Sequence, residues 1–125
     1  MKLIAALLVA AVPAGMAHAA GQRSQFVVCD NGLRCFAAPC PSRSALDLET
    51  GAVLAGVSVD TTDLDLPPAF GSLDEALYRG TIVIAGTAEQ RILGEFGRKR
   101  SETVIRAETV VRLATPAERA QCSTP

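Results

Sequence analysis

Four cysteines constrain this 125-residue chain more than any other feature of its sequence: Cys29, Cys35, Cys40 and Cys122. An even number of cysteines in a small exported protein predicts a disulfide framework, although four cysteines allow three pairings. Cys35 and Cys40 enclose only four residues, and Pro39 bends that segment, so we favour a Cys35–Cys40 bridge. The other pair, Cys29 and Cys122, would then join the two ends of the domain. Chain entropy predicts a stabilisation of about 4–5 kcal/mol for such a long loop.

The expectation of an oxidising compartment comes from residues 1–19. Lys2 precedes an apolar run over residues 3–12, and Ala17-His18-Ala19 has the A-x-A pattern of a signal-peptidase site. Residues 1–19 therefore read as a signal peptide, and residues 20–125 as a single domain in the periplasm or outside the cell. Cleavage would remove His18, the only histidine. After residue 19 no apolar run is long enough to span a membrane.

The first half of the domain shows short strand patterns separated by turn residues. Residues 25–29 read as a short strand. Asn31-Gly32 after it is a strong hairpin signal, which predicts a return strand over residues 33–37. Two further strands are predicted over residues 44–49 and 52–60, on either side of the turn at Gly51. The prolines at 39 and 41 place residues 38–43 in a loop.

The second half combines two short helices with longer strands. Ser72 and Glu75 form a capping-box pattern at the start of a helix over residues 73–78, which Gly80 ends. Residues 81–88 predict a central strand with a bulge or bend at Gly86, and residues 90–96 predict its partner. A strand over 102–113 follows, with Thr103, Ile105, Ala107, Thr109, Val111 and Leu113 as its expected core face. Thr115, Pro116 and Glu118 indicate a second capped helix at the C-terminal end.

About six short strands with one or two short helices predict a mainly β fold, a small antiparallel barrel or sandwich. A short helix between the two halves of such a barrel is also the outline of an OB-like barrel.

Several functional classes are disfavoured by composition. Loss of His18 leaves no imidazole to act as a general base or a metal ligand. The cysteine spacings lack the close pairs of a zinc site and the Cys-x-x-Cys of a redox motif. Asp60, Asp63 and Asp65 do not match a calcium loop. Few aromatic residues and a net negative charge disfavour nucleic acid, and Arg98-Lys99-Arg100 reads as a charged turn. We expect no enzyme activity, no cofactor and no bound metal.

The loop around Cys40 is the most distinctive candidate binding surface. Pro39, Pro41 and the expected Cys35–Cys40 bridge would hold residues 38–43 in one shape, and a rigid loop loses little entropy when it binds. Small disulfide-bonded protease inhibitors present a peptide in this way, and Arg43-Ser44 would suit a trypsin-like pocket. The alternative interpretation is a loop fixed only for stability.

One resemblance adds to this interpretation. The segments Phe26-Val27-Val28-Cys29, residues 35–42 (CFAAPCPS) and residues 77–86 (LYRGTIVIAG) follow a signal peptide. In this combination the chain resembles small exported bacterial proteins of a family of unknown function with a Cys-x4-Cys-Pro motif. The resemblance implies a small exported β domain and brings no catalytic residues.

We therefore expect a non-enzymatic, monomeric binding or envelope-associated module whose ligand is an unknown protein or envelope component. The first alternative is an inhibitor of a secreted protease that acts through the Cys40 loop. The second alternative is a thiol-redox or metal-binding protein.

Overall fold

The computed structural model describes residues 23–36, 40–93 and 99–123. The predicted signal peptide, Pro39 and the Arg98 end of the charged turn lie outside these residues. The described chain contains five strands and two α-helices, with one short 3-10 helix before the first α-helix. In order they are β1 (Arg23–Asp30), β2 (Arg43–Asp47), β3 (Val53–Asp60), η1 (Pro68–Phe70), α1 (Leu73–Arg79), β4 (Ile82–Leu93), β5 (Arg100–Leu113) and α2 (Pro116–Ser123).

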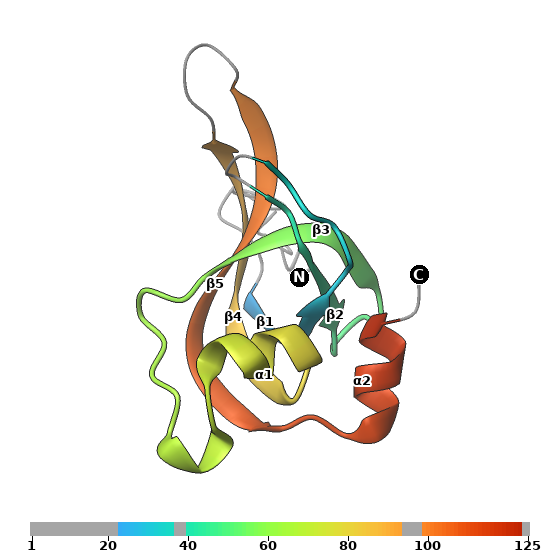
Figure 1. Ribbon diagram of the computed structural model, residues 1–125, viewed down its shortest axis with the longest axis vertical. Helices are drawn as coiled ribbons and strands as arrows, with labels where there is room; N and C mark the ends of the chain where they lie inside the picture. The colour runs from blue at the N-terminus through green and yellow to red at the C-terminus, as the bar shows by residue number, and fades with distance from the viewer. Residues whose placement is uncertain (1–22, 37–39, 94–98, 124–125) are drawn as a thin grey trace, which may run out of the picture.

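The strands close into a barrel in the order β1-β2-β3-β5-β4, with β4 pairing back onto β1 (Figure 1). The pairs are antiparallel except for β3 with β5, which run parallel at Ser58 to Asp60. Five strands in this order, with α1 between β3 and β4, form an OB-like barrel. The predicted mainly β class and barrel are confirmed, whereas the described chain has five strands rather than about six.

β1 lies between β2 and β4 and buries side chains on both of its faces. Phe26 and Val28 point into the barrel, where they join the main core. Residues of the other four strands, of α1 and of the β3–α1 loop complete that core: Ala45, Val57, Leu64, Ala76, Leu77, Ile82, Ile84, Ile105 and Ala107. The helix α1 lies across one end of the barrel and closes it (Figure 1).

The outer face of β1 contacts a second, smaller core beneath α2. Val27 and Cys29 meet Leu46 and Val83 there, and Cys122 of α2 packs onto them. Cys29 and Cys122 form a disulfide with Cα atoms 6.2 Å apart, and Cys35 and Cys40 form the other, with Cα atoms 5.6 Å apart. This is the pairing that we favoured from the spacing.

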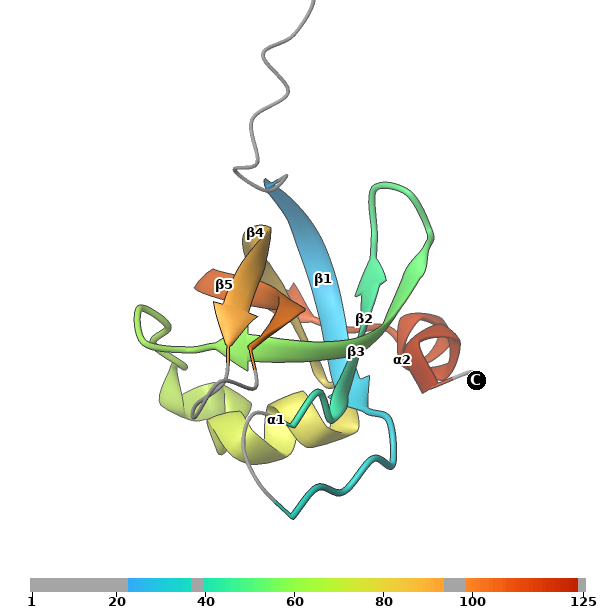
Figure 2. The same cartoon turned by 90° about the horizontal axis from the view of Figure 1, so that it is seen from above.

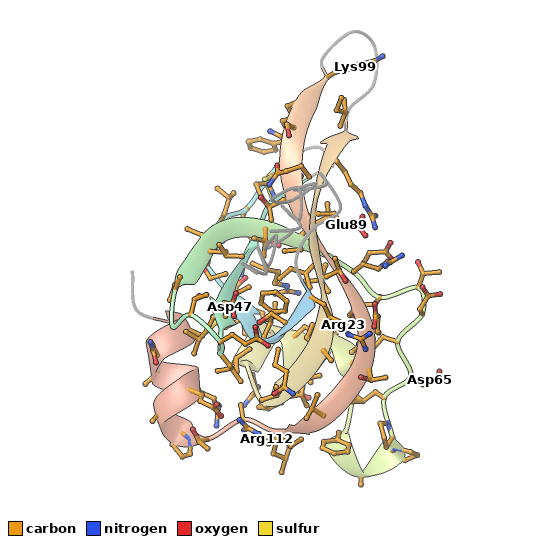
Figure 3. All side chains as sticks on the ribbon, turned by 180° about the vertical axis from the view of Figure 1, so that it is seen from behind. Arg23, Asp47, Asp65, Glu89, Lys99 and Arg112 are labelled. Atoms are coloured by element: carbon orange, nitrogen blue, oxygen red, sulfur yellow. A yellow bond between two sulfur atoms is a disulfide. The ribbon has the colours of Figure 1, made fainter. Side chains whose placement is uncertain are left out.

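β4 and β5 form a long ribbon whose far end extends beyond the barrel, with Lys99 at its tip (Figure 3). The two strands predicted at 81–88 and 90–96 are therefore one strand as far as residue 93, and the partner strand is β5. The bulge predicted at Gly86 is present, because the pairing of β4 with β5 shifts register there. A Cβ at this position would collide with the Arg106 carbonyl oxygen.

The predicted core face of β5 is correct for only part of the strand. Ile105 and Ala107 are fully buried, but Val111 and Leu113 are 43% and 60% exposed. Between Ala107 and Thr109 the pairing with β4 skips one residue, so the side chains change faces beyond that bulge, and Val110 packs against the core instead.

The predicted hairpin at Asn31-Gly32 is wrong, because residues 31–36 form no strand. The side chains of Asp30 and Asn31 accept hydrogen bonds from the backbone N–H groups of Gly32 and Leu33. These local turns compete with a ladder between neighbouring strands. The chain therefore leaves the sheet at Asp30 and returns to it at Arg43.

Both predicted helices are present, but only one has its predicted cap. In α2 the Thr115 hydroxyl accepts from the Glu118 N–H, and Glu118 accepts from the Thr115 N–H. In α1 the Ser72 side chain makes no capping bond, and the Glu75 carboxylate, the other partner of the predicted capping box, lies 3.0 Å from Arg79. Gly80 ends α1 in the left-handed conformation, as predicted.

The two disulfides should differ in their contribution to stability. They span sequence separations of 93 and 5 residues, so chain entropy predicts losses of about 4–5 kcal/mol for C29A/C122A and about 2 kcal/mol for C35A/C40A. Urea unfolding of both double variants measures the difference in their free energies of unfolding. Each variant replaces one disulfide by two alanines, so the two serve as controls for each other. An equal loss in the two variants would contradict this assignment of the long bridge as the main covalent clamp.

Glu118 should stabilise the fold only above acidic pH. Its carboxylate receives two hydrogen bonds from Arg112, at 2.8 and 2.9 Å, and one from the Thr115 N–H, and these lower its pKa from 4.5 to about 2 (Arg112 is labelled in Figure 3). A pKa lowered in the folded state gives stability that is complete above pH 4.5 and is lost as the pH falls toward 2. Glu118→Gln should therefore cost about 1 kcal/mol at pH 7 and almost nothing near pH 2.

Urea unfolding at both pH values checks this expectation. Glu75→Gln is the matched control, because Glu75 belongs to an ion pair whose side chains are 60% and 61% exposed, and such pairs contribute little. An E118Q loss that stays constant with pH would refute the role assigned to the carboxylate charge.

Candidate binding site at the β1–β2 loop

A hollow of about 300 Å³ lies beside the loop that connects β1 to β2. The loop leaves the end of β1 and runs past α1 before it enters β2 (Figure 2). Three parts of the chain line the hollow, namely the loop, the strand ends that flank it, and α1. The lining residues are Asp30, Leu33, Arg34, Cys35, Cys40, Ser42, Arg43 and Tyr78. We call this group the loop site.

Asn31 ties the two ends of the loop together. Its backbone N–H donates to the Ser42 carbonyl at 3.0 Å, and its side-chain Nδ2 donates to the carbonyls of Pro41 and Arg43 at 2.9 and 3.3 Å. The Cys35–Cys40 disulfide adds a covalent link farther out in the loop. The described part of the loop is thus held by backbone, side-chain and covalent contacts, although it contains no regular secondary structure.

One carboxylate in the loop site contacts two guanidinium groups. Asp30 accepts from Arg34 Nη1 and Nη2 at 3.0 and 3.3 Å, and Arg43 Nη1 lies 3.6 Å from it. The Arg34 hydrogen bonds lower the pKa of Asp30, and the Gly32 N–H and the charge of Arg43 act in the same direction. The same pairing raises the pKa of Arg34. Asp30 and Arg34 are therefore charged at neutral pH, and the loop site places two guanidinium groups beside one carboxylate.

Apolar and aromatic groups are exposed around these charges. Tyr78 of α1 is 50% exposed, and the Arg43 guanidinium lies over its ring, 6.0 Å from the centroid. Leu33 is 43% exposed, and Phe36 has the full accessibility of a free side chain. The loop site therefore offers cationic and apolar surface within one small region, which is a common composition for recognition surfaces.

Of the three residues predicted for the binding loop, Pro39, Pro41 and Arg43, only Pro41 lies in the described part of the loop. Pro39 lies outside the described residues. Pro41 lies near Gly56 of β3, where a Cβ added to the glycine would lie 3.8 Å from the Pro41 Cβ. Arg43 is not a loop residue but the first residue of β2, where it pairs with Asp30 of β1 and Val57 of β3. The expectation that residues 38–43 form one continuous loop is therefore wrong at Arg43.

Sequence reasoning missed several residues of the loop site. Leu33 and Arg34 both fall in the return strand predicted over residues 33–37, so neither was considered for binding. The Asp30-x3-Arg34 spacing is a signal that could have indicated an ion pair across a turn. Tyr78 carried no such signal, because only the packing of α1 against the end of the barrel brings it to the loop.

The other candidate residues serve internal contacts. Asp60 accepts from the Thr62 hydroxyl and N–H and from Arg91, and these bonds lower its pKa to about 2. Arg91 also contacts Glu89, which lies 3.4 Å from Arg106. Over residues 23–36, 40–93 and 99–123, no three acidic, cysteine or histidine side chains converge in a way that could hold a metal ion.

In the described segments, no helix combines the length and the apolar character needed to cross a bilayer. Two disulfides are typical of proteins in oxidising compartments. Comparisons with protein-family models, with curated proteins and with solved structures found no match for this chain.

Proposed function

We propose that this protein is a non-enzymatic binding module of the bacterial periplasm or the cell exterior, and that it binds a partner protein through the loop site. The disulfides and the leader pattern support an exported location, since disulfides persist in oxidising compartments. The support for binding comes from the loop site alone.

The exposure of Phe36 carries the proposal. A phenyl ring with the full accessibility of a free side chain contributes nothing to the core, and it follows Cys35 of the loop site, which itself has two exposed apolar side chains, Leu33 and Tyr78. Aromatic residues and arginines are the side chains that most often dominate the energy of protein interfaces. In the loop site Tyr78 lines the same hollow as Arg34 and Arg43.

The way the loop is held also supports binding. A binding surface that is already ordered loses less conformational entropy when a partner docks. The Cys35–Cys40 disulfide and the three hydrogen bonds of Asn31 provide that order without burying the apolar side chains. A loop held only for stability would gain more by turning Leu33 and Phe36 toward the core.

Protease inhibition through Arg43 has less support. An inhibitor of this kind presents its peptide bond on an exposed, extended loop, whereas Ser44 is 8% exposed and pairs with strands on both sides. Thiol exchange likewise has less support at Cys29 and Cys122, because both side chains are buried.

Capture from an envelope extract tests the proposal. The immobilised protein should retain a partner, and Phe36→Ser combined with Tyr78→Ser should reduce that retention at least tenfold, because truncation of central aromatic residues is costly at interfaces. Ile92→Ser is the matched control, since Ile92 is 74% exposed on the β4–β5 ribbon, and it should retain the partner fully.

Retention that survives the double substitution would contradict a role for the loop site. Assays of a trypsin-like protease with an equimolar amount of the protein run in parallel. Loss of protease activity that Arg43→Ala restores would replace this proposal with the inhibitor alternative.

A further inference from the structure

We infer that the loop site recognises a carboxylate attached to an apolar group, as found at an apolar C-terminal residue of a protein chain. This inference rests on the proposed function, because it names the chemistry that the same site would recognise in a partner. It follows from the balance of charge, the free hydrogen-bond donors and the shape of the hollow.

Charge is unbalanced in the loop site. Among the residues that line the hollow, Asp30 is the only acid, while Arg34 and Arg43 are both cations. Asp30 is shared between them, so the site keeps an excess of one positive charge. A ligand that brings one carboxylate would neutralise that excess, whereas a cationic ligand would increase it.

The two guanidinium groups keep hydrogen-bond donors for such a ligand. Each has five N–H donors. Within the described chain Arg34 uses them on Asp30, on the Leu33 carbonyl and on Tyr78, and its side chain is still 63% exposed. Arg43 lies 3.6 Å from Asp30, which is longer than a hydrogen bond, so this contact does not occupy its donors. Paired arginine donors match the geometry of a carboxylate.

Apart from Ser42, the remaining lining residues carry apolar or aromatic surface, and the space is small. The Tyr78 ring, the Leu33 side chain and the Cys35–Cys40 disulfide surround a volume of about 300 Å³. That volume lies at the lower end of the range for small-molecule pockets and accommodates a group the size of one large side chain. An apolar group beside the carboxylate would cover surface that is now exposed on Leu33 and Tyr78.

NMR titration of the ¹⁵N-labelled full chain at pH 7 tests the inference with three probes. The first is acetyl-Ala-Ala-Phe with a free carboxylate, the second is the same peptide with a C-terminal amide, and the third is 3-phenylpropanoate. The acid peptide should shift the amide signals of Leu33, Arg34, Ser42 and Arg43, and it should bind about tenfold more tightly than the amide, since hydrogen bonds between charged groups supply that difference.

The third probe separates the two sources of this chemistry. Tighter binding of the acid peptide than of 3-phenylpropanoate identifies a protein C-terminus as the ligand, and equal binding identifies a small apolar acid. Both results support carboxylate recognition.

Two further measurements connect binding to the guanidinium charge. Arg34→Gln should lower the affinity for the acid peptide to that of the amide, while Arg119→Gln, an exposed substitution on α2, should leave it unchanged. Added salt should weaken binding of the acid but not of the amide to the wild-type protein, which keeps the test valid if Arg34→Gln fails to fold.

Equal binding of the acid and the amide at the loop site would overturn carboxylate recognition and leave the binding module intact. An absence of shifts with all three probes at millimolar concentration would also overturn it. The capture experiment on Phe36 and Tyr78 does not depend on charge, so failure of the proposed function itself would be seen there instead.

Discussion

Burial of both faces of β1 is the interaction on which the rest of the molecule depends. The inward side chains of this strand join the barrel core, but the outward ones, Val27 and Cys29, need a second cover. That cover is α2, a helix of eight residues, which is too short to be stable by itself. Glu118 caps one end of the helix and the Cys29–Cys122 disulfide holds the other, so the two contacts together keep α2 on the barrel.

The loop site begins where this strand ends. Because β1 is packed on both faces and its last residue, Asp30, pairs with Arg43 of β2, the position of Asp30 is fixed and its carboxylate can orient two arginines. The charges around Arg91 of β4 have the opposite balance. Arg91 is one cation between two carboxylates, those of Asp60 and Glu89, each 3.0 Å away. An arginine so matched has little attraction for a further anion, whereas a carboxylate shared between two arginines leaves charge available.

The pattern of local preferences predicted the barrel and its disulfides but not the details of register or the site. The Cys35–Cys40 pair and most strand segments depend on neighbouring residues, and those predictions hold, except that residues 33–36 form no strand and residues 90–93 continue β4. The faces of β5 depend on a bulge opposite Gly86, which is a property of the pairing between two strands and not of either strand alone. Tyr78 reaches the loop through the packing of a helix that is distant in sequence, so no local pattern could indicate it.

The wrong hairpin prediction at Asn31-Gly32 has a physical meaning of its own. A hairpin there would have paired residues 33–37 with β1 and placed alternate apolar side chains on the core face. Instead, Asp30 and Asn31 bind the backbone locally and Asn31 joins the loop ends, so Leu33 and Phe36 remain in water. Their exposure gives up hydrophobic stabilisation of about 1.5–3 kcal/mol for each buried side chain of this size. Departures from local rules that lose stability are expected chiefly at sites that act on other molecules, and this departure lies beside a hollow that two arginines, an aromatic ring and a disulfide line together.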